Sequence, residues 1–312
     1  MSGVIISGYV VIYLVVLGIA IRNRRSFPLS ESIMVILIIG VGFTGLVYFL
    51  APRLTELSAH AVSLPELLFT LAYLVGVSLM LVFVDPVPSV WKDDFFKRKL
   101  VKLCYKLILF VVIPLLVLRL VWDVNWNDLG FSIQKLPHQI LAALVLSLCF
   151  GGFNYIAGSG AKPIRAGEFS VRQLTIWFPL VFLWNMLEVG LVEEFFFRAF
   201  LQTRLTHVFG SSLAGICAAS LLFGLAHAPG LYLRNGDKGG PLGEQPTLLN
   251  AILYSILVLS PAGWFTGLLF VRTQSLLAPI LVHAAIDTVA HVSEFIQATH
   301  TEKSILTRQT AL

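Results

Sequence analysis

Nine long runs of apolar residues, separated by short polar segments, are the feature that most limits how this chain of 312 residues can fold. An α-helix rises about 1.5 Å per residue, so about 20 apolar residues cross the hydrocarbon core of a bilayer. The chain therefore predicts an all-α fold, a polytopic transmembrane helix bundle of about nine spans. The runs cover residues 3–21, 33–50, 67–84, 100–121, 140–157, 174–192, 213–228, 249–271 and 276–292.

Composition supports a membrane protein and excludes an ordinary soluble enzyme. Hydrophobic residues make up 57% of the chain and charged residues 12%, against about 45–50% and about 25% in soluble domains. The net charge of +5 comes from 22 basic and 17 acidic residues, and the basic ones lie mostly between the apolar runs. Charge placed in this way sets membrane topology and does not indicate a nucleic-acid surface. We therefore expect the lipid bilayer as a partner and no nucleic acid.

The positions of Lys and Arg predict an orientation. The first run lacks a basic leader and is followed at once by Arg22, Arg24 and Arg25, which is typical of an uncleaved anchor whose far end is cytoplasmic. The N-terminus would then lie outside and the C-terminus in the cytoplasm. The other basic residues placed inside are Lys92, Lys97, Arg98, Lys99, Lys162, Arg165, Arg172, Arg234, Lys238, Lys303 and Arg308. Those placed outside are Arg53, Lys135, Arg198, Arg204 and Arg272.

Ionisable residues inside membrane spans are functional candidates, because each costs about 2.5–3.5 kcal/mol on insertion scales. The first cluster is EEFFFR, with Glu193, Glu194 and Arg198 at the end of the sixth run. Residues four apart share a helix face, so Glu194 and Arg198 are predicted to form a structural ion pair, with Glu193 turned about 100° away. Glu193 is then free for chemistry. The alternative is a patch of charge where the helix leaves the bilayer.

Two further clusters lie in later runs. FGLAH places Phe223 one turn before His227, and HAAID places His283 one turn before Asp287. Each has a structural alternative, since a lone histidine can be a packing residue and a histidine can simply pair with an aspartate. If the three helices converge, however, a glutamate in apolar surroundings can act as general base on water beside one histidine. The other histidine can donate to the oxyanion of an attacked peptide carbonyl.

The three motifs, EExxxR, FxxxH and HxxxD/N in this order, resemble those of the type II CAAX prenyl endopeptidase and bacteriocin-processing family (CPBP, or ABI) of intramembrane proteases. The resemblance covers roughly residues 174–292. It implies Glu193 as base, His227 as its partner in binding water, and His283 with Asp287 at the oxyanion, all four catalytic. It further implies supporting roles for Glu194, Arg198 and Phe223.

Asp287 departs from the asparagine that some members of this family have. An amide can donate a hydrogen bond to an oxyanion, whereas an ionised carboxylate only accepts. Asp287 is therefore predicted to orient and charge His283, or to belong to a metal site. Glu193, His227 and His283 form a His₂Glu set of the kind that holds catalytic zinc. We expect a reaction without a cofactor, and Zn²⁺ bound by these three residues is the alternative.

These observations predict an intramembrane protease that cleaves a membrane-anchored protein or a peptide precursor, in the inner membrane of a prokaryotic cell. The predicted organisation is an accessory N-terminal transmembrane region (1–139), a protease core (140–296) and a polar C-terminal tail (297–312). Two alternatives remain open. One is a non-catalytic membrane scaffold or immunity protein, and the other is a transporter that uses the buried charges as a proton path. The oligomeric state is left open.

Overall fold

The computed structural model describes residues 1–51, 62–132, 136–233, 242–243 and 245–310, and side chains up to residue 299. Within this part of the chain, nine helices are long and apolar enough to cross a membrane. The prediction of an all-α bundle of about nine spans is confirmed, and the chain is an integral membrane protein. The spans are Ser2–Arg22, Leu29–Leu50, Leu64–Phe83, Phe95–Val121, Leu136–Ala157, Val171–Phe209, Ser212–Leu233, Leu248–Thr273 and Leu277–Thr299.

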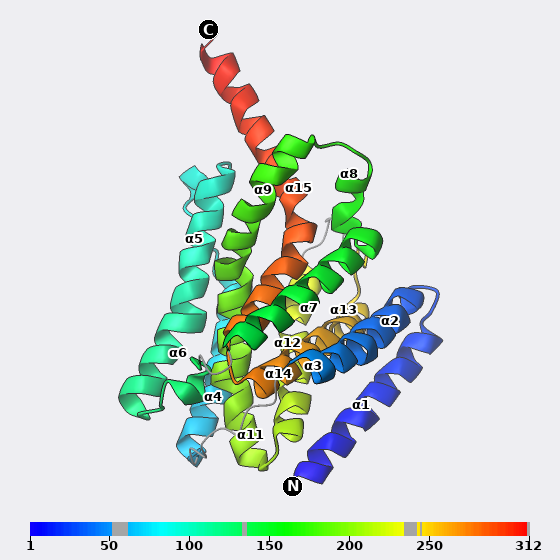
Figure 1. Cartoon of the computed structure of the whole chain (residues 1–312), viewed down its shortest axis with the longest axis vertical. Coiled ribbons are helices and arrows are strands. Elements are labelled where there is room, and N and C mark those ends of the chain that lie inside the picture. Colours follow the sequence, from blue (N-terminus) through cyan, green and yellow to red (C-terminus); the bar gives the residue numbers. More distant parts are fainter. Residues whose placement is uncertain (52–61, 133–135, 234–241, 244, 311–312) are drawn as a thin grey trace.

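Several spans join α-helical and π-helical pieces without a break (Figure 1). The first five spans are built from α1 (Ser2–Arg22), α2 (Leu29–Val35), η1 (Ile36–Phe43), α3 (Thr44–Leu50), α4 (Leu64–Phe83), α5 (Phe95–Leu107), η3 (Ile108–Val112), α6 (Ile113–Leu116), η4 (Val117–Val121) and α7 (Leu136–Ala157). Short elements between spans are η2 (Ser89–Trp91), η5 (Asn127–Leu129), η6 (Ser159–Ala161) and α8 (Lys162–Arg165).

The last four spans contain the predicted motifs. The sixth consists of α9 (Val171–Asn185), η7 (Met186–Leu191), α10 (Val192–Glu194), η8 (Phe195–Gln202) and α11 (Thr203–Phe209). The seventh is α12 (Ser212–Leu233), and the eighth consists of α13 (Leu248–Tyr254), η9 (Ser255–Leu259) and α14 (Ser260–Thr273). The ninth is α15, which runs from Leu277 to Thr310. The predicted tail from residue 297 therefore continues this helix, which projects beyond the bundle in Figure 1.

The sixth span is longer than its predicted range of 174–192, because it continues as one helix of 39 residues to Phe209. All residues from Phe195 to Arg204 are buried inside the bundle. The prediction that Arg198 and Arg204 lie in an outer segment is wrong, because each is buried against a carboxylate. The basic residues Arg53, Lys135, Arg234 and Lys238 lie outside the described residues, as do the side chains of Lys303 and Arg308.

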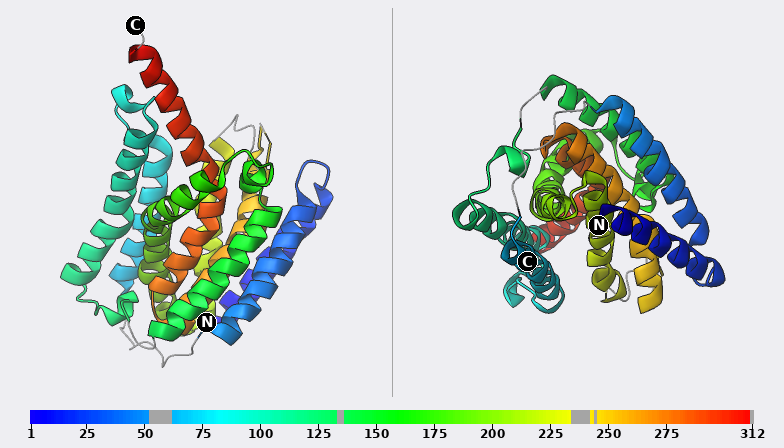
Figure 2. Two further views of the ribbon diagram at one scale, coloured as in Figure 1. Left: turned by 45° about the horizontal axis from the view of Figure 1, so that its top comes forward. Right: turned by 90° about the horizontal axis from the view of Figure 1, so that it is seen from below.

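The N-terminal helices pack directly against the helices that contain the motifs (Figure 2). On α1, the Tyr13 hydroxyl donates a hydrogen bond of 2.7 Å to the carbonyl of Ile256 in η9. On α4, Glu66 forms an ion pair with Arg204 of α11 at 3.0 Å. Whether residues 1–139 are only accessory to the predicted core stays a prediction, but the helices that the structure describes in this range are part of the same packed bundle.

Candidate active site

Three helices bring the side chains of the three motifs to one point in the bundle. Oε2 of Glu193, on α10, lies 3.8 Å from Nε2 of His227 on α12 and 3.9 Å from Nε2 of His283 on α15. The three side chains remain partly accessible, at 21% for Glu193, 34% for His227 and 13% for His283. A small molecule held between these atoms would therefore contact one carboxylate oxygen and two imidazole nitrogens.

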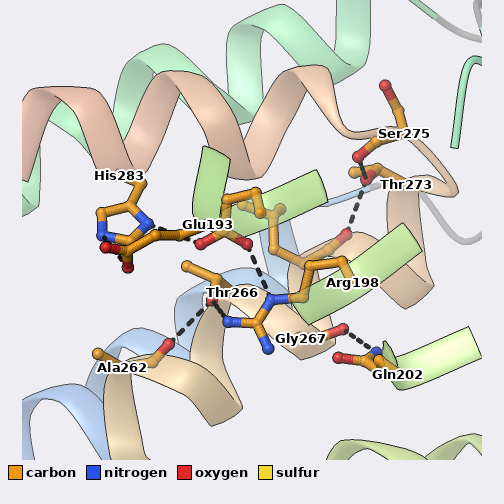
Figure 3. Close-up of polar contacts among 11 residues, drawn as sticks. Glu193, Arg198, Gln202, Ala262, Thr266, Gly267, Thr273, Ser275 and His283 are labelled. Carbon is orange, nitrogen blue, oxygen red and sulfur yellow. Dashed lines mark hydrogen bonds and ion pairs between the residues drawn. The ribbon is translucent and has the colours of Figure 1, made fainter. Parts of the chain in front are cut away.

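A chain of buried polar contacts holds the ring of His283. Its Nδ1 lies 2.7 Å from Oε1 of Glu194, and Oε2 of Glu194 accepts a hydrogen bond of 2.8 Å from Nε of Arg198. The Arg198 guanidinium in turn donates to Oγ1 of Thr266 at 2.7 Å, and Thr266 donates to the carbonyl of Ala262 (Figure 3). Glu194 and Arg198 are completely buried. The position of His283 is thus fixed through Glu194 by a network that reaches α14.

The predicted ion pair of Glu194 and Arg198 is present, and Glu193 points away from it, as the helical spacing predicts. The π-helical segments η7 and η8 lie on either side of α10. Such segments are rare and often occur at functional sites, although in this chain η1, η3, η4 and η9 are also π-helical. Here η7 and η8 flank the turn that carries the two glutamates. Glu193 faces both histidines, and Glu194 contacts Arg198 and the other nitrogen of His283.

His227 is held by its own helix. Its Nδ1 lies 2.8 Å from the carbonyl oxygen of Phe223, four residues earlier. A carbonyl only accepts hydrogen bonds, so Nδ1 must carry the proton, and Nε2 of the neutral ring then has a free lone pair. The Phe223 ring lies 4.9 Å from the His227 ring and 5.3 Å from the Arg198 guanidinium carbon. Phe223 therefore contacts both the histidine and the buried ion pair.

The prediction that Asp287 orients His283 needs a correction. Glu194, not Asp287, makes the short contact with Nδ1 of His283. Among the contacts of the described side chains, Asp287 has an electrostatic interaction with His283 but no hydrogen bond to it. The reason is geometric, because the carboxylate of Glu194 already occupies the side of the ring that an orienting group would need.

Two parts of the site were not predicted from the sequence. Thr266 belongs to no motif, and nothing in its surroundings along the chain distinguishes it. Gly224 has a detectable signal, since small residues in membrane helices permit close helix contact. A Cβ atom at Gly224 would lie only 2.2 Å from the carbonyl oxygen of Ser255, in η9. Glycine at this position therefore brings α12, which carries His227, close to the helix that carries Thr266.

The same three side chains can be compared with a zinc site. Glutamate and two histidines are suitable ligands, and the Nδ1 atoms of both histidines face an oxygen, as is usual for metal-binding histidines. Ligand atoms at about 2.0–2.1 Å from a tetrahedral ion lie about 3.3 Å apart, which is less than the 3.8 and 3.9 Å found here. Within the described residues, no group of three or more His, Cys, Asp or Glu side chains has the arrangement of a metal site.

Comparison with known protein families gives a match. Residues 175–289 match the family model described as type II CAAX prenyl endopeptidase Rce1-like. The matched segment begins in α9 and ends in α15, and it contains the residues of all three motifs. No curated protein and no solved structure gives a significant match to the chain.

Proposed function

We propose, from the match of residues 175–289 to the type II CAAX prenyl endopeptidase Rce1-like family, that this chain hydrolyses a peptide bond of a membrane-anchored protein or a peptide precursor. The family supports an intramembrane protease in general. The observation that carries the finer proposal is the position of Glu193, whose Oε2 faces Nε2 of both His227 and His283. Such a set can hold one water molecule beside a base.

In the proposed reaction, Glu193 is the general base. The water donates one hydrogen bond to Glu193 and the other to Nε2 of His227, whose lone pair is available because Nδ1 is occupied by the carbonyl of Phe223. Glu193 takes a proton as the water oxygen attacks the peptide carbonyl carbon. When the C–N bond breaks, the same proton passes to the departing amine, so that Glu193 is again a carboxylate after each turnover.

His283 is proposed to stabilise the oxyanion of the tetrahedral intermediate. Only a protonated ring can donate from Nε2 while Nδ1 donates to Glu194, and the negative charge of Glu194 favours that form. Arg198 forms an ion pair with Glu194 inside the bundle, so the buried pair has a role in the reaction although neither residue touches the substrate. Asp287 adds negative charge near the ring.

We propose that this reaction needs no metal ion, because Oε2 of Glu193 lies farther from each histidine Nε2 than two ligands of one tetrahedral zinc ion lie from each other. Zinc dependence is the competing mechanism. Strong chelators distinguish the two, since they would abolish cleavage by a zinc enzyme and leave a glutamate-dependent reaction unchanged.

We also propose that the N-terminus lies outside and the C-terminus in the cytoplasm, in the inner membrane of a prokaryotic cell. The two ends of the chain lie at opposite ends of the bundle (Figure 1). The basic segments at the start of α5 and around α8 lie at the end from which α15 projects. Clusters of Lys and Arg favour the cytoplasmic side.

The test is cleavage of a panel of membrane-anchored precursors by the purified protein in water enriched in ¹⁸O. Hydrolysis must place ¹⁸O in the new carboxyl terminus of the product. Glu193→Gln and His227→Ala are expected to abolish this product while eluting as the wild type does on gel filtration. If both variants cleave as well as the wild type, the site is assigned wrongly. If none of the precursors is cleaved by any form, the protease assignment fails in favour of a non-catalytic scaffold.

A further inference from the structure

Helix α15 carries a line of polar side chains that continues well beyond the candidate active site. His283, Asp287, His291 and Glu294 are four, four and three residues apart, so they lie along one face of the helix. We refer to these four residues as the polar stripe. From His283 to Glu294 the helix advances by about 17 Å, which exceeds half the thickness of the hydrocarbon core of a bilayer.

Exposure increases along the polar stripe away from the site. The side chain of His283 is 13% exposed and that of Glu294 is 45% exposed. Asp287 and His291, between them, are half-buried, and Ala290 on the same face is exposed. In the described part of the chain, no hydrogen bond or ion pair is made by the side chains of Asp287 and His291.

A carboxylate and an imidazole at membrane depth are too costly to place against lipid tails. Such groups either pair with other side chains or face water, and here pairing accounts only for the two ends of the polar stripe. His283 is held by Glu194, and Glu294 forms an ion pair of 3.3 Å with Lys99 of α5. The middle of the polar stripe must therefore be solvated.

Charged residues on α5 and η7 border the outer part of this face. Lys106 forms an ion pair of 3.4 Å with Glu188, and Glu188 also interacts electrostatically with Lys99. Lys99 is the partner of Glu294, so the two ion pairs belong to one charged group that joins α5, η7 and α15. The polar stripe thus ends in a charged region on the side from which α15 projects beyond the bundle (Figure 1).

We propose that water reaches Glu193 along the polar stripe, from the membrane face toward which the C-terminal end of α15 extends. The proposal rests on the proposed function, because it supplies the water that Glu193 activates. It goes further by naming the membrane face from which water enters and the side chains that hydrate the path. Two of these side chains, His291 and Glu294, lie outside the family motifs.

The experiment is labelling of single cysteines with a charged, membrane-impermeant thiol reagent in sealed membrane vesicles of both orientations. Ala290→Cys and His291→Cys are each placed in a chain in which Cys104, Cys149 and Cys217 are replaced by Ser. The matched control is a chain that keeps Cys149 alone, which is exposed on α7. Its depth is comparable, because a Cβ atom at Gly151, two residues away, would lie 3.9 Å from the side chain of Val289, next to Ala290. Two test positions are used so that one misfolded variant does not decide the result.

Thiols react as thiolates, which form only in contact with water. We expect the test cysteines to react about tenfold faster or more than Cys149, and only when the reagent is on the face toward which α15 extends. Reaction no faster than that of Cys149, or reaction only from the opposite face, would overturn the path. Labelling needs no proteolysis. If the test cysteines are labelled as expected but the Glu193→Gln variant still cleaves, the proposed function alone is rejected. If the test cysteines are not labelled but the enzyme is active, the water path alone is rejected.

Discussion

Two buried ion pairs on the same long helix have similar geometry and different surroundings. Glu194 and Arg198 are 2.8 Å apart and completely buried, and Glu66 and Arg204 are 3.0 Å apart and 2% exposed. In the first pair the glutamate also contacts His283, which faces the partly exposed Glu193. In the second pair, Arg204 donates to the carbonyl of its own helix at Ala199 and links it to α4.

The difference shows why a buried charge in a membrane span does not by itself mark a site. Both pairs satisfy the general expectation that such charges are paired. The first is connected, through His283, to a side chain that solvent or substrate can reach, since Glu193 is 21% exposed. The second joins an N-terminal helix to the helix that carries the site, and the effect expected from it is on stability.

Among changes to the two ion pairs and their neighbours, the largest effect is expected from Glu194→Gln. The substitution leaves the Arg198 charge buried without a partner, which costs about 3–5 kcal/mol, and it removes the charge that supports a protonated His283. We expect cleavage per folded molecule to fall by about 100-fold or more, together with a lower melting temperature. Near wild-type cleavage by the folded fraction would show that the pair is structural only.

Glu66→Gln is the matched change in the other pair. It should lower the free energy of unfolding by about 3–5 kcal/mol, because Arg204 then loses its ion pair with Glu66 and keeps the electrostatic interaction with Asp128. Cleavage per folded molecule should change little, since no residue of this pair contacts Glu193 or either histidine. A thermal melt in detergent and a rate normalised to folded protein measure the two effects separately. A loss of specific activity as large as that of Glu194→Gln would remove the distinction between the pairs.

Thr266→Val tests the far end of the network that holds His283. The variant keeps the shape of the side chain but removes the acceptor of the Arg198 guanidinium, at a cost of about 1–3 kcal/mol. We expect cleavage to slow several-fold. Thr273→Val on the same helix is the control, because its buried hydroxyl bonds only within the end of α14 and the following turn. Equal effects of the two variants on the rate would argue against a positioning role for Thr266.

The smallest effect is expected from Asp287→Asn. Glu194 already holds Nδ1 of His283, so an amide at position 287 should slow cleavage by less than about tenfold. The rate of the purified variant at saturating substrate measures this. A loss as large as that of Glu194→Gln would restore Asp287 as the residue that controls the histidine.

Contacts between residues close in sequence could be predicted from helical spacing, whereas contacts between residues distant in sequence could not. The four-residue separation of Glu194 and Arg198 predicted their pairing and left Glu193 free. The ion pair between Glu66 and Arg204 joins residues 138 positions apart, and no local pattern contains that information. Hydropathy also depends only on neighbouring residues, so it predicted an end of the sixth span that is too early. A rule that counts every Arg as a surface charge cannot recognise one that is buried by a distant glutamate.

The central claim is that Glu193 activates water, and the most direct measurement compares Glu193→Gln with Glu188→Gln. Glu188 lies on the same helix, and its carboxylate forms an ion pair with Lys106 of α5. With purified protein and one precursor substrate, Glu193→Gln is predicted to lower the rate constant of cleavage by about 10²–10⁴-fold with an unchanged melting temperature. Glu188→Gln should retain a rate close to that of the wild type. Wild-type cleavage by folded Glu193→Gln, or an equal loss in both variants, would contradict the account.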